Sequence, residues 1–209
     1  GNYHVNPQEV EIIIIEAGSH ILSKMDEAFA ARIHKKLLEK SIKIVTKTKI
    51  VSRTPDTVTL SSGKVLRTKT VIWTGGIRIQ ELTRQSGMKT GQLGRIIVDE
   101  FLNVEEYPSI YAIGDNALAV NPHSKEAVPA AAQFALQQGR LAADNIYADI
   151  SGRMRKSYHP KLLGEVVGLG RHLAVGWLAL PFFKKITFVG FLGSLLKTAV
   201  QKKHIFLLR

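Results

Sequence analysis

Strand and helix patterns alternate near the start of the chain. Residues 9–18 (EVEIIIIEAG) contain four consecutive isoleucines followed by an acid and a glycine, a pattern typical of a buried parallel strand that ends in a turn. Residues 26–42 carry apolar side chains at helical spacing, with acidic residues first and lysines late, as the helix dipole favours. A return strand at 43–51 would complete an α/β unit.

The hydrophobic period changes after this unit. Residues 51–76 alternate apolar and polar positions between turn signals, which predicts a β-meander, and the apolar run TVIW then ends at Gly75–Gly76. Residues 95–115 hold two further strand candidates, of which IYAI is expected to be the more buried. A helix is predicted from Pro129, because proline is tolerated in a first helical turn.

The C-terminal tail follows a polar linker at 151–160. Residues 173–183 and 186–196 are apolar blocks of eleven residues, divided by Lys184–Lys185. Each is shorter than the roughly 20 residues that a membrane-spanning helix needs, so the pattern favours re-entrant or surface-lying amphipathic segments. In the second segment Lys197, Gln201 and Lys202 are expected opposite an apolar face. That face comprises Phe191, Leu192, Leu195, Leu196, Ala199 and Val200.

Charge is concentrated in the tail. The net charge is +12, and +10 of it lies from Arg153 onward, where eleven lysines and arginines accompany a single acid, Glu165. Basic residues beside aliphatic runs favour an anionic membrane surface, and no basic stripe with stacking aromatics points to nucleic acid. The sequence has no cysteine, which excludes disulfides and cysteine-ligated metal, and its seven histidines show no metal-ligand spacing. We therefore predict no metal site.

Three short motifs suggest ligand contacts. In IYAIGD an apolar strand stops at Gly114, which lets a ligand approach the backbone, and Asp115 offers a carboxylate to hydroxyl groups. In VPAAAQFALQQG, Gln133 and Gln137 lie one helical turn apart among small alanines, so a flat ligand could lie against them. Glu16 ends the first strand, where a dinucleotide-binding fold places an acid on the NAD ribose. Each motif could also be an ordinary turn, solvated helix face or strand end.

Two of these motifs lie in longer stretches that resemble known flavoproteins. Residues 94–115 (GRIIVDEFLNVEEYPSIYAIGD) resemble the fingerprint of flavoproteins with two dinucleotide-binding domains. AAAQFALQQG resembles the AQxxxQ motif of type II NADH dehydrogenases, single-subunit enzymes that pass electrons from NADH through FAD to a quinone. The resemblance implies that Gly114 and Asp115 bind the FAD ribityl chain.

The resemblance assigns further residues to ligands. Ala132 and Gln133 would contact the flavin, Gln133 and Gln137 would frame the quinone, and a loose match in the tail places Lys197 near the flavin. Residues 71–82 (VIWTGGIRIQEL) resemble the crossover segment of the same flavoproteins. There Trp73 and Thr74, with Gly75 and Gly76, would pass near the nicotinamide of NADH and the flavin. Glu16 would bind the NAD ribose.

The family comparison also shows what the sequence lacks. Neither glycine-rich βαβ fingerprint, for FAD or for NADH, is present, and no catalytic residue is assigned. We therefore expect the C-terminal portion of such an enzyme, which alone would hold FAD poorly and would not turn over. The expected fold is an α/β, Rossmann-like partial flavoprotein with an amphipathic membrane-anchoring region. The expected segments are 1–78 (NADH-binding part with meander), 79–152 (FAD-binding part) and 153–209 (membrane association).

The resemblance implies a peripheral enzyme on the cytoplasmic face of the cell membrane and allows a homodimer. Two alternatives remain open at the level of sequence. One is a soluble FAD-dependent reductase of the same superfamily with another electron acceptor. The other is a non-catalytic membrane-binding module that keeps the fold.

Overall fold

The first part of the chain forms a strand, a helix and a parallel return strand. The computed structural model describes residues 6, 9–23, 25–76, 79, 81–170, 172–180 and 183–207. Strands β1 (Ile13–Ile15) and β2 (Lys43–Val45) pair in parallel, and α1 (Glu27–Leu38) connects them. Asp26 caps α1 by accepting a hydrogen bond from Phe29 N at 3.0 Å, which satisfies one of the free donors of the first turn.

The predicted α/β unit is therefore confirmed, although its helix is shorter than expected. It ends at Leu38 rather than residue 42, and Ser41, with a φ of 59°, turns the chain toward β2. The predicted meander is also confirmed. Strands β3 (Ile50–Arg53), β4 (Thr57–Leu60) and β5 (Val65–Arg67) form an antiparallel sheet in sequence order. The run TVIW forms no strand, and Trp73 at its end is 70% exposed.

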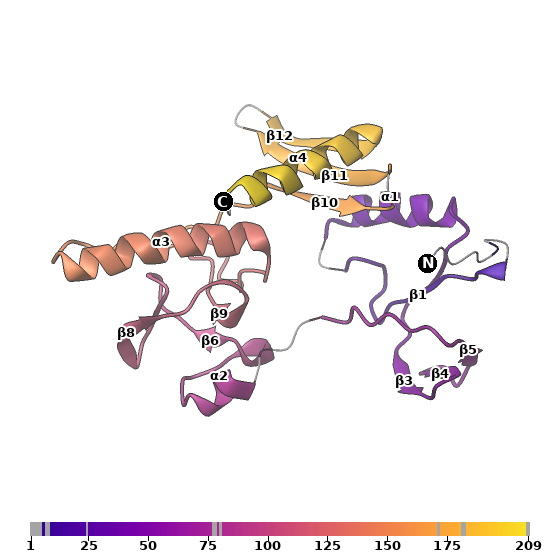
Figure 1. The fold of residues 1–209 in the computed structure, drawn as a ribbon, viewed down its shortest axis with the longest axis horizontal. Coiled ribbons are helices and arrows are strands. Elements are labelled where there is room, and N and C mark those ends of the chain that lie inside the picture. The colour runs from indigo at the N-terminus through magenta and orange to yellow at the C-terminus, as the bar shows by residue number, and fades with distance from the viewer. Residues whose placement is uncertain are drawn as a thin grey trace. The chain divides into compact units, whose positions relative to one another are not determined.

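The tail folds differently from the prediction. The first apolar block lies in β11 (Ala174–Leu180), and the second is divided between β12 (Phe183–Gly190) and α4 (Phe191–Leu207). With β10 (Gly164–Gly168) the two strands form an antiparallel sheet of order β10-β11-β12, against which α4 packs (Figure 1). The expectation of two amphipathic surface segments is therefore wrong for the first block, because its side chains enter a protein core.

That core joins the tail to the first α/β unit. Its buried side chains come from α1 and the loop before it, and from β11 and the loop before that strand. The cluster consists of Ile21, Phe29, Ile33, Leu37, Leu169, Val175 and Trp177. Gly193 of α4 packs on the other face of β11, so close to Ala174 O that a Cβ could not be accommodated. Because β11 is covered on both faces, it reads as one continuous apolar run.

The central part of the chain has a core of its own around one long helix, α3 (Ala132–Ile150) (Figure 1). Before α3 the chain forms α2, 3-10 turns at Gln92–Gly94 and Gly114–Asn116, and four short strands. Strand β6 pairs in parallel with β9, and β7 pairs antiparallel with β8. The element bounds are α2 (Glu81–Gln85), β6 (Ile96–Ile97), β7 (Asn103–Val104), β8 (Tyr107–Tyr111) and β9 (Ala117–Leu118). The core comprises Val98, Leu102, Val104, Ala112, Ala117, Ala119, Val128, Phe134 and Tyr158.

These two cores define two units. Unit 1 is Gly1–Trp73 with Gly164–Arg209, and unit 2 is Thr74–Leu163. The boundaries differ from the predicted segments 1–78, 79–152 and 153–209, because the tail shares the core of unit 1 and residues 153–163 belong to unit 2. Among the described residues, no helix has the length and hydrophobicity needed to cross a bilayer.

Candidate functional site

The glycine of IYAIGD forms a tight turn held by α3. Strand β8 ends at Tyr111, and Gly114 adopts a φ of 66° at the start of the 3-10 turn. Its N–H donates to Gln138 Oε1 at 2.6 Å, and Gln138 is 1% exposed. A Cβ on Gly114 would lie 3.5 Å from Ala135 Cβ, so the turn packs directly on the helix. The carboxylate of Asp115, next in sequence, is exposed.

The N-terminus of α3 lies beside this turn and lacks a side-chain cap. Ala131 occupies the cap position in an extended conformation and supplies no capping oxygen. Its carbonyl accepts from Phe134 N and Ala135 N at 3.0 and 3.1 Å. The N–H groups of the first turn and the dipole of this 19-residue helix together favour an anionic group. Ala132, exposed at the first position, leaves the backbone accessible.

A buried arginine supports the same region. Arg95 is 5% exposed, and its Nη1 donates to Val128 O at 3.0 Å, just before α3. Its Nε has no hydrogen-bond partner among the described residues. Burial lowers the pKa of Arg95, and the negative charge of Asp115 opposes that shift. A cation thus lies close enough to Asp115 for the two charges to interact, which sequence reasoning had missed.

The two glutamines of the AQxxxQ motif hold a backbone segment. Gln137 Nε2 donates to Lys161 O at 2.9 Å and to Gln133 O at 3.1 Å, and Gln137 Oε1 accepts from Lys161 N at 2.9 Å. Gln133 Oε1 accepts from Leu163 N at 3.0 Å. Both glutamines therefore lie on one face, as predicted, and that face holds residues 161–163.

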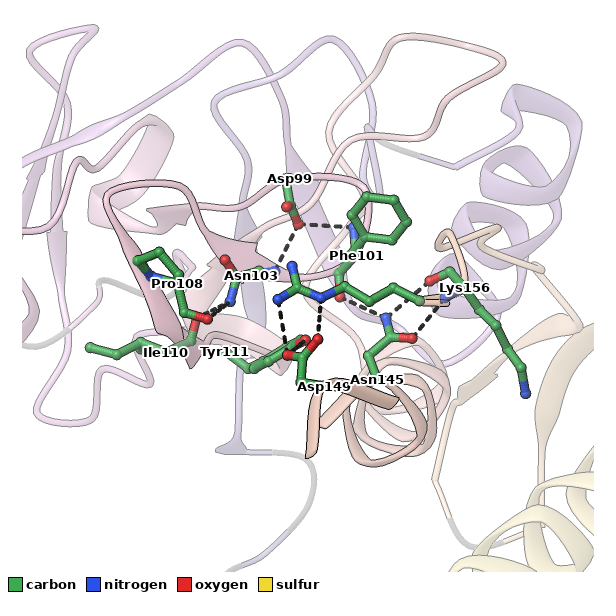
Figure 2. Close-up of polar contacts among 10 residues, drawn as sticks. Asp99, Phe101, Asn103, Pro108, Ile110, Tyr111, Asn145, Asp149 and Lys156 are labelled. Atoms are coloured by element: carbon green, nitrogen blue, oxygen red, sulfur yellow. Dashed lines mark hydrogen bonds and ion pairs between the residues drawn. The ribbon is translucent and has the colours of Figure 1, made fainter. Parts of the chain in front are cut away.

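The same hydrogen-bonding pattern continues along α3. Asn145 Oδ1 accepts from Lys156 N at 2.8 Å, and its Nδ2 donates to Lys156 O and Phe101 O at 3.0 and 3.1 Å (Figure 2). Asp149 accepts from Arg155 Nε and Nη2 at 2.5 and 2.9 Å. We name residues 155–163 the strap, because α3 side chains bind it along its length although it forms no helix or strand.

Tyr111 completes the polar cluster at the C-terminal end of α3. Its hydroxyl donates to Asp149 Oδ2 at 2.7 Å (Figure 2), and the Arg155 guanidinium lies 5.8 Å from its ring centroid. Burial, followed by the bond to Asp149, raises the pKa of Tyr111 to about 12. The hydrogen bonds from Arg155 and then Tyr111 lower the pKa of Asp149. Protonation of the pair is thus fixed near neutral pH.

The remaining predicted site residues are spread over both units. Glu16 follows β1 in unit 1, and its Oε1 accepts from Gly18 N at 2.6 Å. Lys197 of α4 is also in unit 1, where a Cβ at Gly168 would come within 2.7 Å of its Nζ. Gly75 and Gly76 are exposed at the start of unit 2, and Gly76 has a φ of 111°. Unit 2 thus brings together the turn, the start of α3 and the motif glutamines.

Comparison with known proteins places the chain in a family. A family model described as pyridine nucleotide-disulphide oxidoreductase matches residues 4–139, which is more than half of the sequence. The chain belongs to this family. It is 26% identical over 197 residues to the type II NADH:quinone oxidoreductase of Haemophilus influenzae, covering 93% of this chain and 44% of that protein. The predicted resemblance to type II enzymes is therefore confirmed.

Two further proteins show similar coverage. The demethylphylloquinone reductase of Synechocystis is 32% identical over 167 residues, covering 78% of this chain and 41% of the relative. The solved structure of NDH2 from Plasmodium falciparum in complex with NADH aligns with a TM-score of 0.74 at 17% identity, covering 91% of this chain and 54% of that one. The chain thus spans about half the length of the proteins that it matches.

Proposed function

We propose that the full-length protein carrying this sequence is an NADH:quinone oxidoreductase that uses FAD. The observation that carries the proposal is the junction of Gly114, Gln138 and α3, which presents an exposed carboxylate beside an uncapped helix N-terminus. The relatives named as quinone oxidoreductases or reductases agree with this assignment. FAD, when bound, would accept a hydride from NADH and deliver two electrons to the quinone.

The residues of unit 2 fit the chemistry of FAD. Gly114 brings the backbone close to α3 without a side chain, and Asp115 offers an exposed carboxylate to ribityl hydroxyls. Ala132 and Gln133 expose the first turn of α3, whose dipole would stabilise negative charge on the pyrimidine side of a reduced flavin. The positive charge of Arg95, which interacts with the charge of Asp115, adds to this field. We assign Gly114, Asp115, Ala132 and Gln133 to FAD.

Quinone binding is assigned to the next turn of the same helix. The amide of Gln137 is hydrogen-bonded to Lys161 and to Gln133 O, so we propose that it frames the quinone by holding the strap as one wall. Gln133 lies between this wall and the flavin end of α3. The two glutamines would thereby orient the acceptor, and small alanines beside them would admit a flat ring.

NADH binding is assigned to residues at turns. Glu16 directly follows β1 of the parallel β1–β2 pair, the position at which a dinucleotide-binding fold uses an acid for ribose hydroxyls. Its carboxylate is half-buried and ordered by the Gly18 N–H. Gly75 and Gly76 would leave room for the nicotinamide. Lys197 is retained as a proposed contact of the flavin.

Membrane association is proposed for α4. Phe191, Leu192 and Leu195 are 65%, 63% and 52% exposed, and they form an apolar face beside the basic tail. Such a face gains free energy at a lipid surface, and each nearby lysine or arginine adds about 1 kcal/mol on anionic lipid. We propose that the enzyme binds the cytoplasmic face of the cell membrane peripherally, where it meets its quinone, and that it acts as a homodimer.

The test separates the two half-reactions. In the full-length protein, Gln137→Phe should slow flavin reoxidation by quinone at least tenfold and leave flavin reduction by NADH unchanged, as stopped-flow absorbance would show. The matched control is Gln92→Phe, because Gln92 is an exposed glutamine of unit 2 away from α3. Loss of flavin reduction with intact quinone reduction would contradict the assignment.

A further inference from the structure

The strap is bound by one row of α3 side chains. Residues 133, 137, 141, 145 and 149 are spaced by four, so they form a single ridge inclined about 26° to the helix axis. Four of them hold the strap by hydrogen bonds, in antiparallel order. The pairs are Asp149 with Arg155, Asn145 with Lys156, Gln137 with Lys161 and Gln133 with Leu163.

The middle residue of the ridge, Leu141, is apolar. Leu141 packs against the core cluster that contains Tyr158 of the strap, and Tyr158 is buried. Tyr158 N also donates to Glu100 O at 2.7 Å. The strap is therefore fixed at both ends by polar side chains and at its centre by burial.

The bonds of Asn145, near the C-terminal end of α3, are the most enclosed. Asn145 is 1% exposed and makes three hydrogen bonds, two of them to both backbone groups of Lys156. Asp149 joins Arg155 to Tyr111 of β8. By contrast Lys161 and Leu163 are exposed, and Gln137 and Gln133 hold them. Asn145 therefore supplies the most enclosed restraint on the strap.

We infer that Asn145 and Asp149 are positioning residues for the quinone site. This inference rests on the proposed function. Asn145 and Asp149 fix the register of the strap on α3, and they thereby place residues 161–163, the wall of the quinone site, against Gln137 and Gln133. Asn145 is eight residues from Gln137, about 12 Å along the helix, so it acts through the strap and does not touch the acceptor.

The experiment uses three variants of the full-length protein. Asn145→Ala removes all three bonds, and Asp149→Asn weakens the Arg155 pair without touching Phe101 or Lys156. Asp144→Asn is the matched control, because it removes only the exposed pair of Asp144 with Lys156 Nζ at 3.0 Å. If Asn145→Ala does not fold, Asp149→Asn still tests the inference.

Two readouts decide the outcome. Amide hydrogen exchange at Lys161 and Leu163 should accelerate about tenfold in Asn145→Ala and about threefold in Asp149→Asn, with no change in the control. The KM for quinone should rise by similar factors while flavin reduction by NADH keeps its rate. Faster exchange confined to residues 155–158, or unchanged KM, would overturn the inference. A wild-type enzyme that oxidises NADH but reduces no quinone would instead overturn the proposed function, while exchange still decides whether register is transmitted.

Discussion

Gln138 Oε1 accepts a hydrogen bond from Gly114 N at 2.6 Å and thereby joins α3 to the turn that carries Asp115. Gln138 occupies the buried stripe of α3, between Phe134 and Ala142. A buried amide that binds a backbone N–H costs little as long as the pair is intact and much when it is broken. The hydrogen bond that links the helix to the turn therefore depends on one side chain.

Replacing Gln138 should lower both the stability of the protein and its affinity for FAD, and the two effects can be measured separately. Gln138→Leu keeps the volume but leaves Gly114 N unpaired, so the free energy of unfolding should fall by about 1–3 kcal/mol. FAD affinity of the full-length protein should fall at least tenfold, because the turn loses its anchor. Chemical denaturation and flavin fluorescence titration measure the two effects. The exposed Gln92→Leu is the control, and unaltered FAD affinity in Gln138→Leu would refute the link.

Two glycines in the same region should respond in opposite directions to alanine. Gly114 has a φ of 66°, where a Cβ costs about 1–2 kcal/mol, so Gly114→Ala should lower stability by that amount. Gly139 lies inside α3, and a Cβ there would make only an ordinary contact of 3.8 Å with Ile113 Cδ1. Gly139→Ala should therefore raise stability by about 0.5–1 kcal/mol. Thermal unfolding of both variants tests the pair, and equal signs would be inconsistent with the structure.

The short motifs were more informative than the hydrophobic pattern about this site. Gly114 and Asp115 lie in the turn after a strand, although that strand ends at Tyr111 and not at Gly114 as predicted. Gln133 and Gln137 share one helix face because four-residue spacing fixes their direction. Gln138 was missed because its neighbour Gln137 explained the motif. The available signal was a polar residue in the stripe Phe134, Gln138, Ala142. Burial of Arg95 had no comparable signal in the sequence.

The tail shows why the hydrophobic pattern alone did not predict strand β11. A run of eleven apolar residues is compatible with a helix or with a strand covered on both faces, and length does not separate them. Val175 and Trp177 face the α1 cluster, whereas Ala174 packs under Gly193 of α4. Both faces of β11 are thus apolar, so the alternation that would identify a strand is absent. The partner surfaces come from segments far away in sequence.

Tyr111, which is hydrogen-bonded to Asp149, should titrate at a higher pH than an ordinary tyrosine. Burial and the bond to Asp149 raise the pKa of Tyr111 to about 12 from 10.0. A raised folded-state pKa means that its stabilising contribution is complete below pH 10 and is lost as the pH rises through about 12. Tyrosinate absorbance should show this step, and Tyr111→Phe should remove it. Asp149→Asn should move it toward pH 10; an unmoved step would exclude Asp149 as a cause.

The exposed face of α4 gives the last test, which concerns the membrane. Leu195 is 52% exposed, so transferring the exposed half of its side chain from water to lipid gains about half of the roughly 1.5–3 kcal/mol that full burial gives. Leu195→Ser in the full-length protein should therefore weaken sedimentation with anionic vesicles about tenfold. Ile150→Ser is the matched control, because Ile150 is an 80% exposed apolar residue at the end of α3. Equal weakening by both substitutions would mean that vesicles bind exposed apolar residues in general, so α4 would not be the docking face.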